Sequence, residues 1–258
     1  MTSTRSTHDD DNHIDFDALF GELIDITQPV GAPSHRGLRI VAREVVRAGV
    51  GMEAPFVLDF GLQPGGDDSS SGGAEPTLAS LADAEHWMIC EVIAWLAGKG
   101  LDKLVGIFSV SLTTLCSERF PREVAAAAHA GGIPLERLCF EIPAATVTNA
   151  NEATLASLRA LHGAGCSFAL SEFVPDAAGF DALKRLPTRY LRISLANLDD
   201  GPSQRNVLRT AQRLARGLGI AVIADGVDDA ERFRRTQDTG VAYASGDFLG
   251  TPAPLETV

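Results

Sequence analysis

The sequence of 258 residues predicts an α/β fold, a closed (β/α) barrel. The first observation is residues 138–193, where three short apolar runs alternate with helical patterns. Each run is too short for a helix and is apolar at consecutive positions, as parallel strands buried on both faces are. The second observation is that the alternation continues over residues 77–248 and gives seven or eight strands. A single barrel accounts for them more simply than two domains do.

The composition excludes some classes of function. The 34 acidic and 22 basic residues give a formal net charge of -12, which repels phosphate backbones and argues against a nucleic-acid partner. No apolar run approaches the ~20 residues that span a bilayer, and the first residues lack the apolar core of a secretion signal. Four cysteines stand in apolar contexts without CxxC spacing, which favours reduced thiols over a zinc site. We expect a cytoplasmic protein without a membrane partner.

The segment before the regular alternation is predicted to hold a tail and a helix. Residues 1–13 are polar with a run of aspartates and are expected to form a disordered acidic tail. Residues 14–258 are expected to form one barrel domain. Phe16, Phe20 and their apolar neighbours have the spacing of an amphipathic helix that ends before Pro29. This helix either packs on the barrel or docks a partner or a second copy.

Three further features precede the barrel repeats. Residues 38–48 show helical spacing with Val41 and Val45, so we expect a second N-terminal helix. Residues 55–64, PFVLDFGLQP, are typical of a strand. Residues 65–75, GGDDSSSGGAE, are expected to be a flexible insertion, because Gly and Ser do not offset the entropy of ordering.

The remaining elements are assigned from apolar periodicity and from capping signals. Leu155, Leu158 and Leu161, for example, recur at helical spacing, and Ser203 is a candidate N-cap. We expect helices at 87–98, 121–129, 151–165, 203–218 and 228–237, and strands at 105–112, 138–143, 166–173, 189–194, 220–227 and 241–248.

Polar residues stand where three of these strands end. They are Glu141, Ser171 with Glu172, and Arg192 with Ser194. Parallel α/β folds carry their chemistry at the carboxyl ends of the strands, so we expect the site there. Glu141 and Glu172 would suit the acid and base of a metabolic barrel enzyme. A structural module without a ligand is the other general alternative.

Six collinear segments within residues 56–254 resemble the EAL-domain proteins. Residues 171–187, SEFVPDAAGFDALKRLP, resemble the family's DDFGTGYSSLSYLKRLP-like loop, including the trailing KRLP. In chain order, SVSL, CFEIPAA, YLRIS, IAVIADGVDDAE and SGDFLGTPAP resemble its VNLS, LELTES, LKID, VIAEGVET and QGYLFGRP segments. The ordered set is far more specific than any one segment.

The resemblance implies a modified TIM barrel that acts in bacterial signalling. Active members of the family hydrolyse cyclic di-GMP with two Mg²⁺ or Mn²⁺ ions, which activate water and hold the phosphate. Such a centre needs several carboxylates at the strand ends. The matching positions here show which of them are kept.

Several positions differ from the family pattern. Glu141 is retained, but Asp59, Ser111 and Ala145 replace a glutamate, an asparagine and a second glutamate. The family's phosphate-gripping arginine has no counterpart in GLQP. The loop's two aspartates, the catalytic lysine, a glutamate and a glutamine are replaced, in that order, by Ser171, Glu172, Arg192, Asp225 and Ser245.

These differences predict that the two-metal centre is lost, because metal sites depend on a full set of ligands at close distances. We therefore expect no hydrolysis, no metal and no other cofactor, with Mg²⁺ or Mn²⁺ bound only if the site is functional. The positions expected to be vestigial are Ser111, Glu141, Ser171, Glu172, Arg192, Asp225 and Ser245.

The resulting prediction is a catalytically inactive EAL-like domain that regulates signalling through contact with another protein. The alternative is a receptor that binds cyclic di-GMP without hydrolysis, through Arg192, Glu141 and Asp225; an active phosphodiesterase ranks third. For Arg192 a simple ion pair with Glu141 or Glu172 is the competing interpretation.

The resemblance also implies an interface. The family dimerises through a loop and helix that correspond to about residues 174–186, so Phe180 and Leu183 are interface candidates, together with Phe16 and Phe20. Ordinary packing onto the barrel is the alternative for each. A homodimer is left open.

Overall fold

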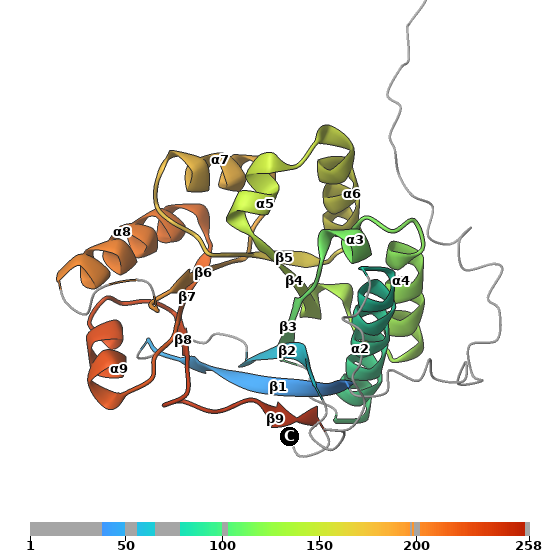
Figure 1. The fold of residues 1–258 in the computed structure, drawn as a ribbon, viewed down its shortest axis with the longest axis horizontal. Helices are drawn as coiled ribbons and strands as arrows, with labels where there is room; N and C mark the ends of the chain where they lie inside the picture. Colours follow the sequence, from blue (N-terminus) through green and yellow to red (C-terminus); the bar gives the residue numbers. More distant parts are fainter. Residues whose placement is uncertain are drawn as a thin grey trace, which may run out of the picture. The chain divides into compact units, whose positions relative to one another are not determined.

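The computed structural model describes residues 38–49, 56–64, 78–99, 103–196, 198 and 202–255 (Figure 1). The predicted acidic tail at 1–13, the helix that holds Phe16 and Phe20, and the insertion at 65–75 lie outside the described residues. The strands are β1 (Leu38–Arg47), β2 (Phe56–Pro64), β3 (Leu104–Ser109), β4 (Leu138–Pro143), β5 (Ser167–Ser171), β6 (Tyr190–Ser194), β7 (Ala221–Asp225), β8 (Tyr243–Ser245) and β9 (Ala253–Pro254).

Helices follow most of the strands and surround the sheet (Figure 1). Side-chain oxygens of Asn151, Asp176 and Asp229 accept hydrogen bonds from backbone N–H groups at three helix starts, which explains why these helices begin there. The helices are α2 (Leu78–Lys99), α3 (Leu112–Leu115), α4 (Phe120–Ala130), η1 (Leu135–Arg137), α5 (Ala144–Asn149), α6 (Glu152–Gly163), α7 (Ala177–Arg185), α8 (Pro202–Leu218) and α9 (Ala230–Gln237).

The sheet is a closed barrel with one reversed strand. Strands β2 to β8 pair in sequence order and are parallel. Strand β1 is antiparallel to both β2 and β8 and so closes the ring. The predicted α/β class and modified (β/α) barrel are confirmed.

The predicted helix at 38–48 is wrong, because this segment forms β1. Val45 belongs to the inner core of the barrel, whereas Ile40 and Ala42 belong to the outer core under the helices. A strand buried on both faces has no alternation of apolar and polar residues, so its valines imitate helical spacing. The proposed N-cap Ser203 is also wrong, because α8 begins one residue earlier, at Pro202.

The buried apolar side chains of the described residues form two hydrophobic clusters. The outer one includes Phe60, Phe108, Phe140 and Phe168 on four adjacent strands, with neighbouring ring centroids 5.4, 5.9 and 6.4 Å apart. Burial raises the pKa of the Cys139 thiol to about 12, so this residue behaves as core. None of the described helices is both long and apolar enough to cross a bilayer.

Candidate functional site

A polar layer lies directly above the inner core of the barrel. The inner core includes at least one residue from each of seven successive strands, among them Val57, Ile107, Cys139, Ala169, Tyr190, Ile223 and Tyr243. Residues two apart share a face of a strand, so the next inward residues are polar ones nearer the carboxyl ends. They are Asp59, Ser109, Glu141, Ser171, Arg192, Asp225 and Ser245. In the reversed strand, Arg43 pairs with Asp59.

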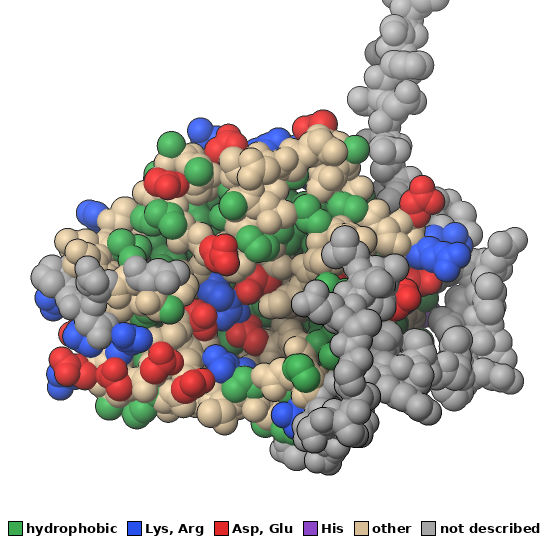
Figure 2. Space-filling view, in the orientation of Figure 1, with side chains coloured by type: hydrophobic (Ala, Val, Ile, Leu, Met, Phe, Trp, Pro, Cys, Tyr) green, Lys and Arg blue, Asp and Glu red, His purple; other side chains and the backbone are tan. Residues whose placement is uncertain are grey.

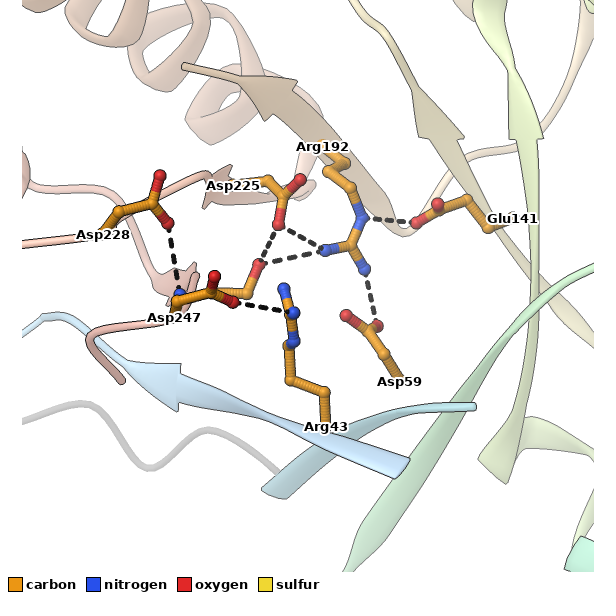
Figure 3. Close-up of polar contacts among 8 residues, drawn as sticks. Arg43, Asp59, Glu141, Arg192, Asp225, Asp228 and Asp247 are labelled. Atoms are coloured by element: carbon orange, nitrogen blue, oxygen red, sulfur yellow. Dashed lines mark hydrogen bonds and ion pairs between the residues drawn. The ribbon is translucent and has the colours of Figure 1, made fainter. Parts of the chain in front are cut away.

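The Arg192 side chain occupies the centre of this layer (Figure 3). Its Nε donates to Glu141 Oε2 at 2.5 Å, and its Nη2 donates to Asp59 Oδ1 at 2.5 Å. Its Nη1 donates to Ser245 Oγ at 3.1 Å and lies 3.6 Å from Asp225 Oδ1. One guanidinium, whose side chain is only 9% exposed, thus joins four strands.

Burial and charge act against each other in this group, which we call the Arg192 cluster (Asp59, Glu141, Arg192, Asp225 and Ser245). Burial raises the pKa of Asp59 and of Glu141 above ordinary carboxyl values, although the Arg192 charge opposes the rise. Burial acts to lower the pKa of Arg192, but the surrounding carboxylates raise it above its ordinary value, so the guanidinium stays charged. Fully ionised, three carboxylates face one cation, and the cluster is electronegative.

Ser245 links two members of the cluster. Its fully buried hydroxyl donates to Asp225 Oδ1 at 2.7 Å while it accepts from Arg192. The next residue, Gly246, has φ +152°, and a Cβ there would lie 2.3 Å from the backbone nitrogen of Val227. Only glycine allows this close approach, which fixes the end of β8 and the position of Ser245.

A cavity of about 550 Å³ opens above the cluster. Figure 2 shows acidic and basic side chains gathered in the middle of the face toward the viewer, with hydrophobic side chains around them. Glu172 is exposed beside it and has φ +52°, which is uncommon for a residue other than glycine and is often found at functional sites. The lining residues are Glu141, Ser171, Glu172, Phe173, Val174, Arg192, Ile193, Ser194, Leu198, Val207 and Asp225.

The structure brings together most of the residues singled out from the sequence. Glu141, Arg192, Asp225 and Ser245 form the cluster, and Ser171 and Glu172 line the cavity. The ion pair considered for Arg192 exists with Glu141, and two more carboxylates share the guanidinium.

Ser111 lies in a different group. Its N–H donates to both carboxylate oxygens of Glu85, at 3.1 and 3.0 Å, and its hydroxyl donates to Glu85 Oε2 at 2.8 Å. Ser111 is also the N-cap of α3, and the Thr114 hydroxyl donates to the same carboxylate. These contacts explain Ser111 as part of the helix start.

Sequence reasoning missed Arg43 and left the role of Asp59 open. Arg43 ion-pairs with Asp247 at 3.0 Å beside the cluster (Figure 3). Arg43 was not among the predicted site residues because its segment was predicted to be a helix. In a strand, its position two residues before Val45 places it in the polar layer.

The family's metal ions can be tested against this arrangement. Carboxylates of the kind that Mg²⁺ or Mn²⁺ prefer are present, since Asp59, Glu141 and Asp225 each contact Arg192. Among the described residues, however, no three His, Cys, Asp or Glu side chains are placed to hold a metal ion together. The inward oxygens of the three carboxylates face the Arg192 guanidinium, and a divalent cation would have to share them with a second positive charge. With Arg192 in this position, the residues present do not fit a divalent cation.

Curated relatives match part of the chain. The cyclic di-GMP phosphodiesterase PdeB of Shewanella oneidensis is 32% identical over 126 residues, which cover 48% of this chain and 15% of PdeB. The cyclic di-GMP phosphodiesterase PdeF of Escherichia coli is 26% identical over 177 residues, covering 66% of this chain and 24% of PdeF. The chain therefore spans about a quarter or less of the length of these relatives.

Solved structures share the fold. The FimX EAL domain of Pseudomonas aeruginosa bound to c-di-GMP has a TM-score of 0.72 at 18% identity, covering 84% of this chain and 91% of that one. The PaMucR phosphodiesterase in complex with c-di-GMP has a TM-score of 0.72 at 18% identity, covering 88% and 96%.

These relatives correct one prediction. The expectation that the chain is not an enzyme and lacks most metal ligands is contradicted, because the curated relatives are named cyclic di-GMP phosphodiesterases. It rested on the combined replacements at the matching positions, with the role of Asp59 left open; the structure places Asp59, Glu141 and Asp225 around Arg192. The family model described as "EAL domain" matches residues 76–252, well over half of the sequence, and the chain belongs to the EAL domain family.

Proposed function

We propose that this chain binds cyclic di-GMP in the cavity above the Arg192 cluster and acts in bacterial cyclic di-GMP signalling in the cytoplasm, with residues 14–258 as one domain. The observation that carries the proposal is the cavity itself, which opens at the carboxyl ends of the parallel strands and has both polar and apolar lining. Membership of the EAL family and the c-di-GMP complexes of FimX and PaMucR support the choice of ligand.

The lining residues suit the parts of a guanine dinucleotide. The apolar side chains of Phe173, Val174 and Leu198 offer surfaces for the flat faces of bases. The exposed carboxylate of Glu172 can accept hydrogen bonds from the N–H groups of a guanine edge. The hydroxyls of Ser171 and Ser194 can donate to phosphate oxygens.

Calorimetric titration of the full chain with cyclic di-GMP tests this proposal. We expect saturable binding by the wild type, and about tenfold weaker binding by Glu172→Gln, because a charged acceptor for guanine is lost. Glu118→Gln removes the same charge at an exposed turn and is expected to bind like the wild type. Absence of binding by the folded wild type would refute the proposal.

The same samples are to be assayed for the linear dinucleotide, since the named relatives are phosphodiesterases. Product that forms with the wild type and is reduced by Glu172→Gln supports this cavity as the place of reaction. Product formation that Glu172→Gln leaves unchanged, together with unchanged binding, would locate the ligand elsewhere.

A second candidate function is contact with another protein, for which a second copy of the chain is the first partner to test. Val174 is 56% exposed and Phe180 is 37% exposed, and both lie at or just before α7. Leu183 is half-buried and packs against the outer core, which favours ordinary packing for this candidate. Sedimentation of the wild type and of Phe180→Asp should show a dimer that the variant loses; a monomeric wild type would refute self-association.

A further inference from the structure

In the Arg192 cluster, oxygen atoms surround a positive charge, as they do in a cation site. The positive charge here is the guanidinium of Arg192. Glu141 Oε2, Asp59 Oδ1, Asp225 Oδ1 and Ser245 Oγ come from four strands and surround one guanidinium at 2.5 to 3.6 Å. Hard divalent cations select such sets of oxygen atoms. Figure 3 shows the carboxylates of Asp59, Glu141 and Asp225 turned toward Arg192, which also donates to Ser245 Oγ.

The guanidinium and a divalent ion would compete for the same lone pairs. A carboxylate oxygen that accepts a short hydrogen bond from an N–H cannot point the same lone pair at a metal, and the two cations would repel each other across a buried space. Arg192 belongs to β6, and its side chain points into the barrel and is only 9% exposed. The buried guanidinium therefore competes with a divalent ion both for these oxygen atoms and for the negative charge of the carboxylates.

We infer that Arg192 acts as the built-in cation of this site, so that the wild-type polar layer takes up no Mg²⁺ or Mn²⁺, and that removing the guanidinium turns Asp59, Glu141 and Asp225 into a divalent-cation site. The inference concerns the cluster alone and does not depend on cyclic di-GMP binding. It accounts for three carboxylates that surround a residue with a permanent positive charge.

The test is Mn²⁺ binding by the full chain without dinucleotide, followed by the electron paramagnetic resonance signal of free Mn²⁺ and by thermal unfolding. The wild type is compared with Arg192→Met, which keeps most of the side-chain length without the charge. Arg43→Met is the matched control, because it removes one positive charge from the same polar layer but leaves the three carboxylates bound to Arg192. Asp59→Asn in the Arg192→Met background removes one of the proposed ligands.

We expect no Mn²⁺ uptake by the wild type or by Arg43→Met, and about one ion per chain for Arg192→Met, with a rise in its melting temperature that NaCl of equal ionic strength does not produce. The added Asp59→Asn change should weaken this binding at least tenfold. Stoichiometric Mn²⁺ binding by the wild type, or no binding by folded Arg192→Met, would overturn the inference. If Arg192→Met does not fold, Arg192→Gln is tested by the same criteria, and the wild-type result stands by itself.

Discussion

Two buried groups near the mouth of the barrel stabilise carboxylates in different ways. Glu85 is 6% exposed and is surrounded by neutral donors, namely the N–H and hydroxyl of Ser111 and the hydroxyl of Thr114. Asp59 and Glu141 instead face the charged Arg192. The first arrangement fixes the start of a helix, whereas the second sets the charge at the floor of a cavity. The comparison shows that a buried carboxylate of this protein is stabilised either by neutral donors or by a charged side chain.

The largest expected effect on stability comes from removing Arg192, the cation that the carboxylates share. Arg192→Ala leaves three carboxylates without it and is expected to lower the free energy of unfolding by about 3–5 kcal/mol, as when one partner of a buried ion pair is removed. Urea unfolding measures the change. Arg159→Ala is the control, because Arg159 pairs with Glu152 on the surface and should cost less than about 1 kcal/mol. Equal losses in the two variants would contradict a special role for Arg192.

A smaller loss of stability is expected in the Glu85 group, where the donors are neutral. Glu85→Ala removes the acceptor for Ser111 and Thr114 and should destabilise the protein by about 1–3 kcal/mol, the cost of unpaired buried donors. Glu91→Ala, at an exposed position of the same helix, should change the stability by less than about 0.5 kcal/mol. A loss no larger than that of Glu91→Ala would show that the donors of Ser111 and Thr114 do not depend on this acceptor.

Ser245→Ala tests the link between Asp225 and Arg192. Loss of the hydroxyl that donates to one and accepts from the other should cost about 1–2 kcal/mol in urea unfolding. Ser117→Ala, in an exposed turn, is the control and should be nearly neutral. If both variants match the wild type, the hydroxyl does not contribute to the cluster.

The weakest expected effect is on pH dependence. The folded-state pKa values of Asp59 and Glu141 are raised from 3.8 and 4.5, so their contribution to stability is fully present below those values and is lost as the pH rises through the folded-state values. The stability of Asp59→Asn relative to the wild type should therefore increase with pH, with a slope of at most about 1.4 kcal/mol per pH unit for one proton. The exposed Asp181→Asn should show a flat difference. If the stability of Asp59→Asn relative to the wild type instead falls as the pH rises, the pKa of Asp59 is not raised by folding.

The barrel could be predicted because apolar runs mark its parallel strands, and the site because each run leads into a polar residue. Glu141 and Arg192 follow Cys139 and Tyr190 by two positions, which is enough to place them on one inner face. The closing strand could not be predicted, since β1 is buried on both sides and its valines lack strand alternation. Because β1 was predicted to be a helix, the pairing of Arg43 with Asp59 in the polar layer could not be predicted.

The role of Ser111 could not be predicted for another reason. Its partner Glu85 lies 26 residues away on α2, and only the resemblance of SVSL to the family's VNLS segment placed Ser111 among ligand positions. An ion pair of Arg192 with Glu141 or Glu172 was only the competing interpretation, and the pair with Glu141 is the one present. A guanidinium shared by three carboxylates depends on the register of β2, β4 and β7. That register is a property of the closed barrel and is not encoded in any one segment.

The most direct measurement is a titration of the wild type with cyclic di-GMP in the presence of EDTA, repeated with Mn²⁺. The proposed cavity and the built-in cation together predict saturable binding with the same dissociation constant in both conditions. No binding in either condition would contradict the proposed ligand, and binding that requires Mn²⁺ would contradict the role assigned to Arg192.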